Sequence, residues 1–189
     1  MLNDKDIRDV LIEKLTKSNK NHDYRIINEL GLCDGEARAD IAVANGKLCG
    51  YEIKSDRDTL ERLSNQIKAY NATFDRITIV VGEKFEHKIL SIVPEFWGVE
   101  VAYMNRFGRV SIKKVRTPMQ NTTIEGESLL ELLWKDELKN LLIQQGIDKG
   151  LSGKNKKTLK EMAIKNVSFK VIRNYTRETL KSRQGWRFD

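Results

Sequence analysis

The chain is poor in cysteine and proline, with two of each in 189 residues. Two cysteines without a C-x-x-C pair exclude a disulfide framework, argue against a cysteine zinc site and are typical of the reducing cytosol. Wholesale disorder and collagen-like repeats are also excluded, because 40% of the residues are hydrophobic and 32% are charged. The composition therefore predicts one cytoplasmic globular domain, with room for a small extension.

Long apolar runs are missing as well. No stretch approaches the ~18–20 residues that a membrane-spanning helix needs. The first residues, MLNDKDIRDVLIEKL, have acids where a signal peptide needs a basic start and an apolar block. We therefore expect no membrane partner.

A glycine-rich phosphate loop is also absent, since Gly31 and Gly35 do not form a G-x-G-x-x-G pattern.

Positive charge is concentrated toward the end of the sequence. The net charge is +7, from 34 Lys+Arg and 27 Asp+Glu. Residues 139–189 hold 13 Lys+Arg against 4 Asp+Glu, whereas residues 1–138 hold 21 against 23. Such asymmetry favours a polyanionic partner, with nucleic acid as the leading candidate. The alternative is a solvated helical surface that is rich in lysine.

Hydrophobic periodicity predicts a mixed α/β core followed by helices only. The predicted helices of the core span 4–17, about 55–72 with a Ser55–Asp58 capping box, and 84–92; its strands span 24–30, two segments of 37–54 around Asn45-Gly46, 77–81, 99–104 and 109–115. After a linker at Pro118, helices are predicted at 126–145, 155–165 and 168–183. We therefore expect a core at 1–118 and a basic helical region at 119–189.

The hairpin within 37–54 carries the residues with chemical potential. A three-residue loop, Ala44-Asn45-Gly46, with Gly46 in the left-handed conformation after a type I turn, would place the apolar residues of both strands on one side of the sheet. Asp40 would then lie opposite Gly50 and diagonal to Glu52, with Cα atoms about 7–8 Å apart. Gly50 has no side chain and would leave space beside the two carboxylates.

Asp40, Glu52 and Lys54 form the candidate site. Two carboxylates with open water positions suit Mg²⁺ or Mn²⁺, which lower the pKa of a bound water and stabilise charge on a phosphate. Lys54 would position the attacking water or stabilise the transition state. Glu-x-Lys is unspecific, since it also occurs at 86–88 and 137–139, but only 52–54 lies on a predicted strand. The alternative is a surface Glu–Lys pair with Asp40 simply solvated.

Asp40 followed by Glu52-Ile53-Lys54 on the next strand resembles the PD-(D/E)XK nuclease superfamily, which includes restriction-endonuclease-like and RecB-like enzymes. Alanine stands here where the family pattern has proline. Gln66 and Tyr70 match the Q-x-x-x-Y pattern of some branches. The stretches ELGLCDGEARADIAVANG, YEIKSDRDTL, FDRITIVVG, LLWKDEL and WRF resemble a small family of bacterial and phage proteins known mainly by a locus tag. This second resemblance extends over nearly the whole chain.

The resemblance implies a restriction-endonuclease-like fold and a Mg²⁺- or Mn²⁺-dependent DNA endo- or exonuclease. Asp40 and Glu52 would hold the metal, and Lys54 would assist the attack of water. Such enzymes often add a fourth acid from an earlier element, for which Glu29 is the candidate and Glu13 the alternative. A role in a phage or mobile element also follows from the resemblance alone.

Residues around this acid–lysine set have less specific expected roles. Gln66 would bind the metal-bound water or a phosphate, and Tyr70 is expected to pack with Leu63 and Ile67. Arg38 either contacts a phosphate or remains an exposed charge on the sheet. The two histidines have no metal-ligand spacing and are expected at the surface.

The basic helical region has two interpretations. As a DNA-binding unit it would contact phosphates without reading sequence, through residues such as Lys156, Lys157 and Lys160. As a helical lid it would only stabilise the core. DNA is the expected partner, and a homodimer is left open.

Aromatic residues near the end of the chain are expected to pack rather than to bind. Trp134 is predicted in the core of the helical region and Trp97 at the sheet edge. Trp186 and Phe188 would cover the hydrophobic core, with stacking on bases as the alternative.

Two other functions compete with the nuclease. A non-catalytic nucleic-acid-binding module on the same fold would bind DNA without metal-dependent turnover. A protein-interaction subunit would dock an acidic protein through the basic tail. The presence of Asp40, Glu52 and Lys54 together favours the nuclease.

Overall fold

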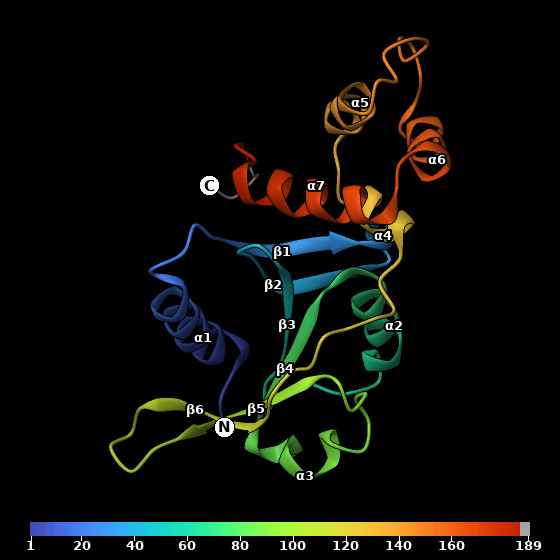
Figure 1. The fold of residues 1–189 in the computed structure, drawn as a ribbon. Helices are drawn as coiled ribbons and strands as arrows, with labels where there is room; N and C mark the ends of the chain where they lie inside the picture. Colours follow the sequence, from blue (N-terminus) through green and yellow to red (C-terminus); the bar gives the residue numbers. More distant parts are fainter. Residues whose placement is uncertain (186–189) are drawn as a thin grey trace.

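A six-stranded mixed sheet forms the centre of the protein, whose computed structural model describes residues 1–185 (Figure 1). The strands follow one another across the sheet in chain order. They are β1 (Arg25–Leu32), β2 (Ala37–Ala44), β3 (Leu48–Lys54), β4 (Arg76–Gly82), β5 (Gly98–Met104) and β6 (Val110–Arg116). β3, β4 and β5 run parallel, and the remaining neighbours are antiparallel. The expected mixed α/β class is confirmed.

Helix α1 (Asp4–Asn19) covers one face of the sheet. Asn3 begins it with a capping box, in which its side chain accepts a hydrogen bond from the Asp6 amide and the Asp6 carboxylate accepts one from the Asn3 amide. Ile7, Leu11 and Leu15 form its buried stripe. They pack on Ile41, Val43, Ile53 and Val80 of the central strands.

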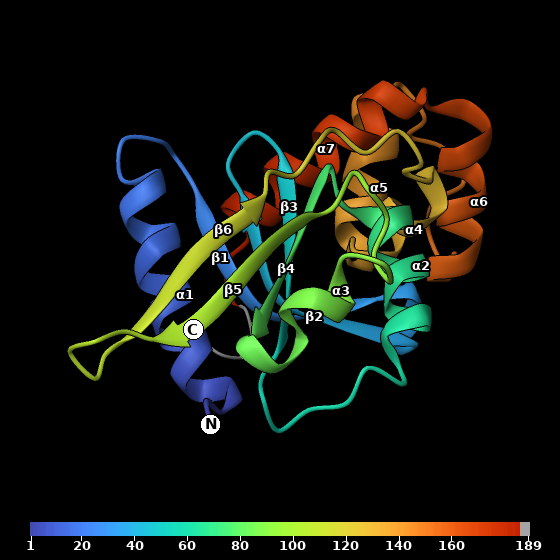
Figure 2. The same cartoon turned by 90° about the horizontal axis from the view of Figure 1, so that it is seen from below.

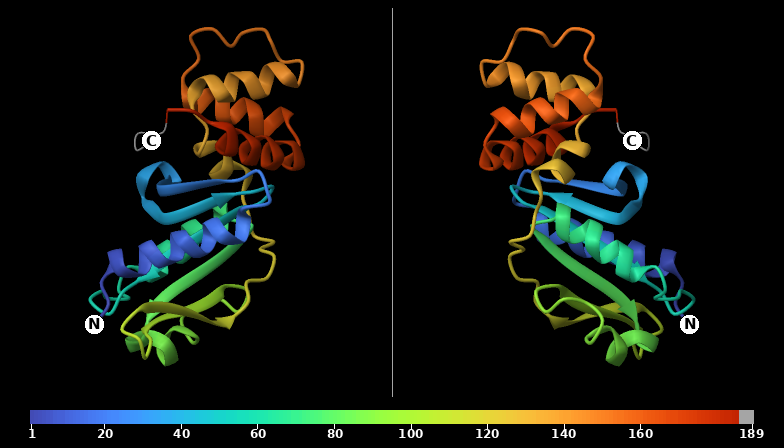
Figure 3. Two further views of the ribbon diagram at one scale, coloured as in Figure 1. Left: turned by 90° about the vertical axis from the view of Figure 1, so that its left-hand side faces the viewer. Right: turned by 90° about the vertical axis from the view of Figure 1, so that its right-hand side faces the viewer.

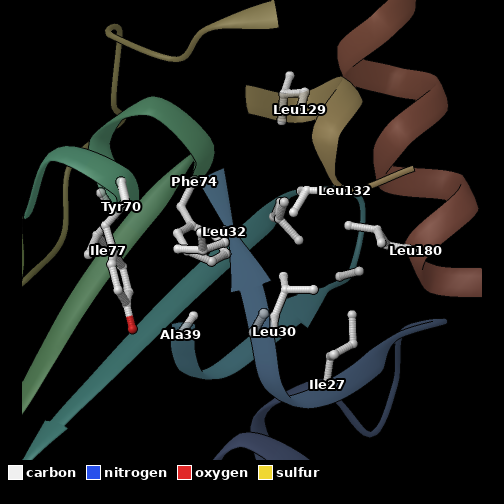
Figure 4. Close-up of a cluster of buried hydrophobic side chains, with 14 of the residues drawn as sticks. Ile27, Leu30, Leu32, Ala39, Tyr70, Phe74, Ile77, Leu129, Leu132 and Leu180 are labelled. Atoms are coloured by element: carbon white, nitrogen blue, oxygen red, sulfur yellow. The ribbon is translucent and has the colours of Figure 1, made fainter. Parts of the chain in front are cut away.

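Helix α2 (Leu63–Thr73) lies on the opposite side of β3 and β4 from α1 (Figure 1). Because helices cover both faces, the apolar run Ile77–Val81 of β4 is buried throughout, as is typical of a parallel strand. Tyr70 of α2 and Phe74, the residue that follows the helix, are fully buried on this side of the sheet (Figure 4). The short α3 (Glu86–Ile89) follows β4.

Helix α2 begins at Leu63, eight residues later than the Ser55–Asp58 pattern predicts. Half of the predicted capping box forms, because the Ser55 amide donates to Asp58 Oδ2 at 2.8 Å. The Ser55 hydroxyl donates to the same oxygen at 2.5 Å, and the Asp58 amide donates to the Ser55 carbonyl at 3.1 Å instead of to the hydroxyl. The same bonds that cap a helix also close an isolated turn. Asp56 holds this segment in place, since its carboxylate lies against Gly82 and accepts the Leu2 amide.

Four helices complete the fold: α4 (Gly126–Glu131), α5 (Lys135–Gln144), α6 (Lys156–Asn166) and α7 (Phe169–Ser182). α7 lies beside β1 and β2, and α5 and α6 form the outer layer beyond it (Figures 1, 2 and 3). Leu129, Leu132 and Leu180 join the same buried cluster as Leu30 and Leu32 of β1 (Figure 4). The helical region therefore shares one continuous core with the sheet.

The predicted helix at 126–145 is interrupted at residues 132–134, and this break changes the position of Trp134. Trp134 is the residue before α5, where the Glu137 carboxylate accepts its amide hydrogen at 2.6 Å. It is 48% exposed, and the Arg183 guanidinium stacks over its ring at 4.3 Å. The prediction of a buried Trp134 is wrong because a side chain at this helix boundary points away from the leucine face.

The predicted edge position of Trp97 is also wrong. β6 forms the edge, and Trp97 stands in the bend that leads into the interior strand β5. Trp97 is fully buried against Tyr70, and its indole N–H donates to Asn71 Oδ1 at 2.7 Å. Trp186 and Phe188 lie outside the described residues. Within residues 1–185, no helix combines the length and the apolar character needed to cross a membrane.

Candidate active site

The β2–β3 hairpin differs in register from the sequence-based expectation by two residues. Ala44 pairs with Leu48 and Ile41 with Tyr51, so the three-residue loop is 45–47 rather than 44–46. Gly46 is left-handed as expected, with φ +90°. A shift of two keeps every side chain on its face, so alternation could not distinguish the registers. The observed one keeps both Ala44 and Leu48 in the ladder and buries them.

This register brings the two key carboxylates together. Ile41 and Tyr51 are the last paired residues of the two strands, and the next facing positions belong to Asp40 and Glu52. The Ile53 amide donates to Asp40 Oδ2 at 2.7 Å. A side-chain oxygen therefore satisfies a buried backbone donor where the ladder ends, and this bond fixes the orientation of Asp40.

Gly50 does not provide open space for an ion, as the sequence suggested. A Cβ atom built on Gly50 would lie 2.5 Å from the Phe74 ring. The space is filled because α2 crosses this face of β3 and delivers an aromatic side chain to it. Glycine is needed here for packing and not for ligand access.

Glu52 is buried, with 1% of its surface exposed, and it accepts three side-chain hydrogen bonds. Lys54 Nζ and Gln66 Nε2 donate to Oε1 at 2.5 and 2.6 Å. The Tyr70 hydroxyl donates to Oε2 at 2.6 Å. Gln66 and Tyr70 are four residues apart on α2 and so share one helix face. The helix thus holds the carboxylate from one side while the adjacent lysine holds it from the other.

Tyr70 has a wider role than the packing predicted for it. Its ring packs on Phe74 and Trp97, with centroids 5.1 and 5.5 Å apart, while its hydroxyl reaches Glu52. Burial, followed by the nearby Glu52 and Asp40 charges, raises the pKa of the phenol well above its usual value. Tyr70 is therefore a permanent hydrogen-bond donor to Glu52.

Asp40 has an unusual electrostatic environment. Burial and the neighbouring Glu52 charge raise its pKa to about 7, although the Ile53 amide and Arg8 act in the opposite direction. A half-buried carboxyl with a pKa near neutral pH beside a buried carboxylate is typical of functional sites. The pair is therefore poised to exchange a proton for another positive charge.

Arg8 of α1 also belongs to the site and was missed by the sequence analysis. Its guanidinium donates to the Asp40 carbonyl at 2.9 Å and contacts Asp40 Oδ1 at 3.2 Å. It also contacts Glu29 Oε1 at 3.1 Å and Asp4 Oδ1 at 3.0 Å. The one local signal was the i, i+4 spacing of Asp4 and Arg8, which is common on surface helices and does not indicate a site.

The two candidates for the fourth acid lie in different places. Glu29 has φ +56°, which is uncommon for a residue other than glycine, and it contacts both Arg8 and Arg38. It thus shares Arg8 with Asp40. Glu13 is exposed and pairs with Lys17. Within residues 1–185, the acids, cysteines and histidines form no group of three that could hold a metal ion.

A hollow of about 490 Å³ opens over these residues. Its polar lining includes Asp4, Glu36, Arg38, Asp40, Glu52, Lys54, Asp58, Arg62, Asn65 and Gln66. Gln66 Oε1 is buried and has no hydrogen-bond partner among the described residues. Two carboxylates and an unused amide oxygen are the oxygen donors that hard divalent cations prefer. The site therefore contains oxygen donors of the type that Mg²⁺ and Mn²⁺ sites use.

The three lysines predicted to contact DNA differ in their surroundings. Lys160 pairs with Asp34 and Glu131 at 3.3 and 3.2 Å. Lys156 donates to the Glu131 carbonyl at 2.7 Å, and burial lowers its pKa. Lys157 is exposed. The first two therefore help to hold α6 against the core, and only Lys157 presents its charge fully to solvent.

Helix α7 uses basic residues in the same way. Arg173 and Arg177 both contact the buried Asp75 carboxylate, at 2.6 and 2.5 Å. Lys181 pairs with Asp23 at 3.0 Å. Charge that appears as a basic tail in the sequence is therefore partly neutralised by acids of the core.

Fold and site together define a mixed α/β protein with an acid–lysine cluster beside its parallel strands. A family model described as bacteriophage P4 protein cII matches residues 1–187. Protein cII of Enterobacteria phage P4 is 33% identical over 183 residues, which are 97% of this chain and 68% of that protein. The chain therefore belongs to the bacteriophage P4 protein cII family, and the expected phage association is confirmed.

One solved structure shows a more distant likeness. It is a protein of unknown function from Silicibacter pomeroyi, with 18% sequence identity and a TM-score of 0.43. The match covers 62% of this chain and 75% of that one.

Proposed function

We propose that this protein is a metal-dependent nuclease that hydrolyses phosphodiester bonds of DNA on a restriction-endonuclease-like fold. The observation that carries the proposal is the meeting of Asp40, Glu52 and Lys54 where β2 separates from β3. The backbone pairing of β2 with β3 ends at Ile41 and Tyr51, and Asp40 and Glu52 are the next residues of the two strands. The resemblance of these residues to the PD-(D/E)XK pattern supports the same conclusion.

The proposed roles follow from the contacts of each side chain. Asp40 and Glu52 would hold Mg²⁺ or Mn²⁺, which when bound would lower the pKa of a water and stabilise charge on the phosphate. Gln66 and Tyr70 keep Glu52 oriented. Lys54, whose ammonium lies 2.5 Å from Glu52 Oε1, would orient the attacking water or stabilise the developing negative charge.

The test is cleavage of labelled linear, circular and branched DNA with Mg²⁺ or Mn²⁺, with EDTA as the metal-free control. We expect metal-dependent cutting that falls at least about 100-fold in Lys54→Ala. Lys88→Ala is the matched control, because Lys88 ends another Glu-x-Lys triplet and is exposed on α3. Cutting of the circular substrate would assign an endonuclease.

Because Lys54 is buried, its variants need a folding control. Lys54→Met keeps most of the side-chain volume, so we expect it to retain a cooperative thermal transition while losing cleavage. Tight, salt-sensitive DNA binding without cutting, unchanged in either variant, would contradict the nuclease and favour the non-catalytic binding module. Absence of both binding and cutting would favour the protein-interaction subunit.

A further inference from the structure

A second hollow, of about 610 Å³, lies on the α1 side of the sheet. α1 and the segment after β6 border it, and α2 with the candidate active site lies on the other side of β3 and β4 (Figure 1). Its polar lining includes Lys14, Ser18, Asn19, His22, Asn45, Lys47, Tyr51, Arg76, Thr78, Glu100, Lys114 and Thr117. The volume lies within the range of about 300–1,000 Å³ that is common for small-molecule sites.

The sheet face beneath this hollow changes character along its strands. Toward the carboxyl ends of β3 and β4 it is apolar, with Ile53 and Val80 packed against α1. Toward the other end, the alternate positions on the same face are Tyr51, Arg76 and Thr78. A sheet face covered by a helix is normally apolar throughout, so these polar residues indicate a function other than packing.

Arg76 provides the most specific observation. It stands at the start of β4, in register with Cys49 of β3. Its Nε–H is buried and has no hydrogen-bond partner in residues 1–185. The carboxylate of the preceding residue, Asp75, contacts Arg173 and Arg177. A buried donor without an acceptor destabilises the folded state, and more so when the group is charged. The lining therefore offers a cation that lacks its anion.

The remaining charges of the lining do not supply that anion. Glu100 is the one carboxylate among the described residues of the lining, and Lys14 Nζ already contacts it at 2.6 Å. Lys47 and Lys114 leave the hollow with excess positive charge beside Arg76. Tyr51 and Thr78 add hydroxyl donors. Burial raises the pKa of the Tyr51 phenol, which therefore stays protonated.

We infer that this hollow binds a small phosphate-bearing molecule of nucleotide size, with Arg76 as its main phosphate contact. A guanidinium binds phosphate through two parallel hydrogen bonds. The neighbouring lysines favour a doubly charged phosphate over a singly charged carboxylate as the ligand. The site lies on the opposite sheet face from Asp40 and Glu52. It does not depend on the proposed nuclease activity, although Tyr51 and Glu52 are adjacent in β3.

The experiment is calorimetric titration of the full chain in EDTA with inorganic phosphate, adenosine 5′-monophosphate and adenosine. We expect the two phosphate-bearing probes to bind and adenosine not to bind. Arg76→Gln should weaken binding at least about tenfold, whereas Arg57→Gln, which changes an exposed arginine outside both hollows, should not. Lys54→Ala should also bind phosphate normally, which separates this site from the candidate active site.

Two measurements keep the inference testable if Arg76→Gln fails to fold. Lys114→Gln changes an exposed residue of the lining and should weaken binding several-fold. In NMR spectra of the unaltered protein, the Arg76 Nε–H resonance should shift on addition of phosphate. The inference would be overturned if neither phosphate nor nucleotide bound, or if a folded Arg76→Gln bound them as tightly as the unaltered protein. Binding of DNA oligonucleotides without binding of phosphate or nucleotide would also overturn it.

Discussion

Glu52 is a buried carboxylate and Asp40 a half-buried one at the facing position, and different groups stabilise each of them. Glu52 is surrounded by donors from Lys54, Gln66 and Tyr70. Asp40 has a backbone amide and part of the Arg8 guanidinium. Burial and repulsion from the Glu52 charge therefore act mainly on Asp40, whose pKa rises to about 7.

The raised pKa of Asp40 predicts a pH-dependent free energy of unfolding. An unfolded aspartate has a pKa of about 3.9, so between about pH 4 and pH 7 the native state binds the extra proton. Stability therefore falls as the pH rises through this window. In EDTA, urea unfolding should show Asp40→Asn gaining on the unaltered protein from about pH 5 to pH 8, by on the order of 2 kcal/mol.

The control for this experiment is Asp9→Asn, since Asp9 is exposed on α1. It should keep the pH dependence of the unaltered protein. If the free energy of unfolding changes by the same amount in Asp40→Asn and in the unaltered protein between pH 5 and pH 8, the pKa of Asp40 is not raised.

At the scale of elements, close approach between β3 and α2 holds the site together. Phe74 lies directly against Gly50 while Tyr70, one turn earlier, reaches Glu52. A shift of α2 away from β3 would therefore move the Glu52 donors as well. The packing of this helix and the orientation of the carboxylate are parts of one contact.

We expect Gly50→Ala to lower the free energy of unfolding by about 2 kcal/mol, because its methyl group would overlap the Phe74 ring. Gly31→Ala is the matched control, since a Cβ there meets no atom within 4 Å. Thermal unfolding measures both. Equal melting temperatures for the two variants would show that α2 adapts without strain.

The buried Asp75 carboxylate anchors two arginines of helix α7. Asp75 accepts the Leu48 amide at 2.7 Å in addition to Arg173 and Arg177. Burial alone would raise the pKa of Asp75, but these donors together lower it below its usual value. The carboxylate thus connects the last helix to the loop before β4 and the start of β3.

Breaking this anchor should destabilise the protein. Asp75→Asn removes the charge that two arginines share, and we expect a loss of about 3 kcal/mol at neutral pH. Because the folded pKa is lowered, the contribution is complete above about pH 4 and disappears as the pH falls through the folded pKa. Acid titration of helicity should therefore show a flatter profile for Asp75→Asn, while Asp136→Asn at an exposed ion pair should behave like the unaltered protein.

For the whole molecule, the basic residues counted in the sequence outnumber those whose charge is exposed to solvent and free of a core acid. Basic residues of α6 and α7 that pair with acids of the core stabilise the fold, whereas the exposed lysines Lys154, Lys157, Lys165 and Lys170 do not. Leucines of α4 and α7 also share the core of the sheet. The sequence-based division at residue 118 therefore separates two parts with a common hydrophobic core.

This division of charge predicts two kinds of variant. If DNA is the partner, Lys157→Gln with Lys165→Gln should weaken its binding and reduce the salt dependence by about one unit per lost phosphate contact, without lowering the melting temperature. Arg177→Gln should instead lower the melting temperature. Fluorescence anisotropy at several salt concentrations measures the first effect, and an unchanged salt slope would exclude this surface from the DNA contact.

Local interactions determined much of this protein from its sequence. The amphipathic spacing of residues 4–17, the apolar run of β4 and the left-handed Gly46 predict elements close to the observed ones, because periodicity and turn chemistry act over a few residues. The residue types of the Asp40–Lys54 hairpin indicate the candidate site for the same reason.

Only the tertiary structure decided the register of the hairpin, the contact of Arg8 with Asp40, the hydrogen bond from Gln66 to Glu52, and the partners of the basic tail. Two registers satisfy the same alternation, and packing of Ala44 and Leu48 selects one. Arg177 meets Asp75 across 102 residues of sequence. The sign of a charge is a local property, but its partner depends on the whole fold, so a lysine-rich sequence could not reveal which charges remain available.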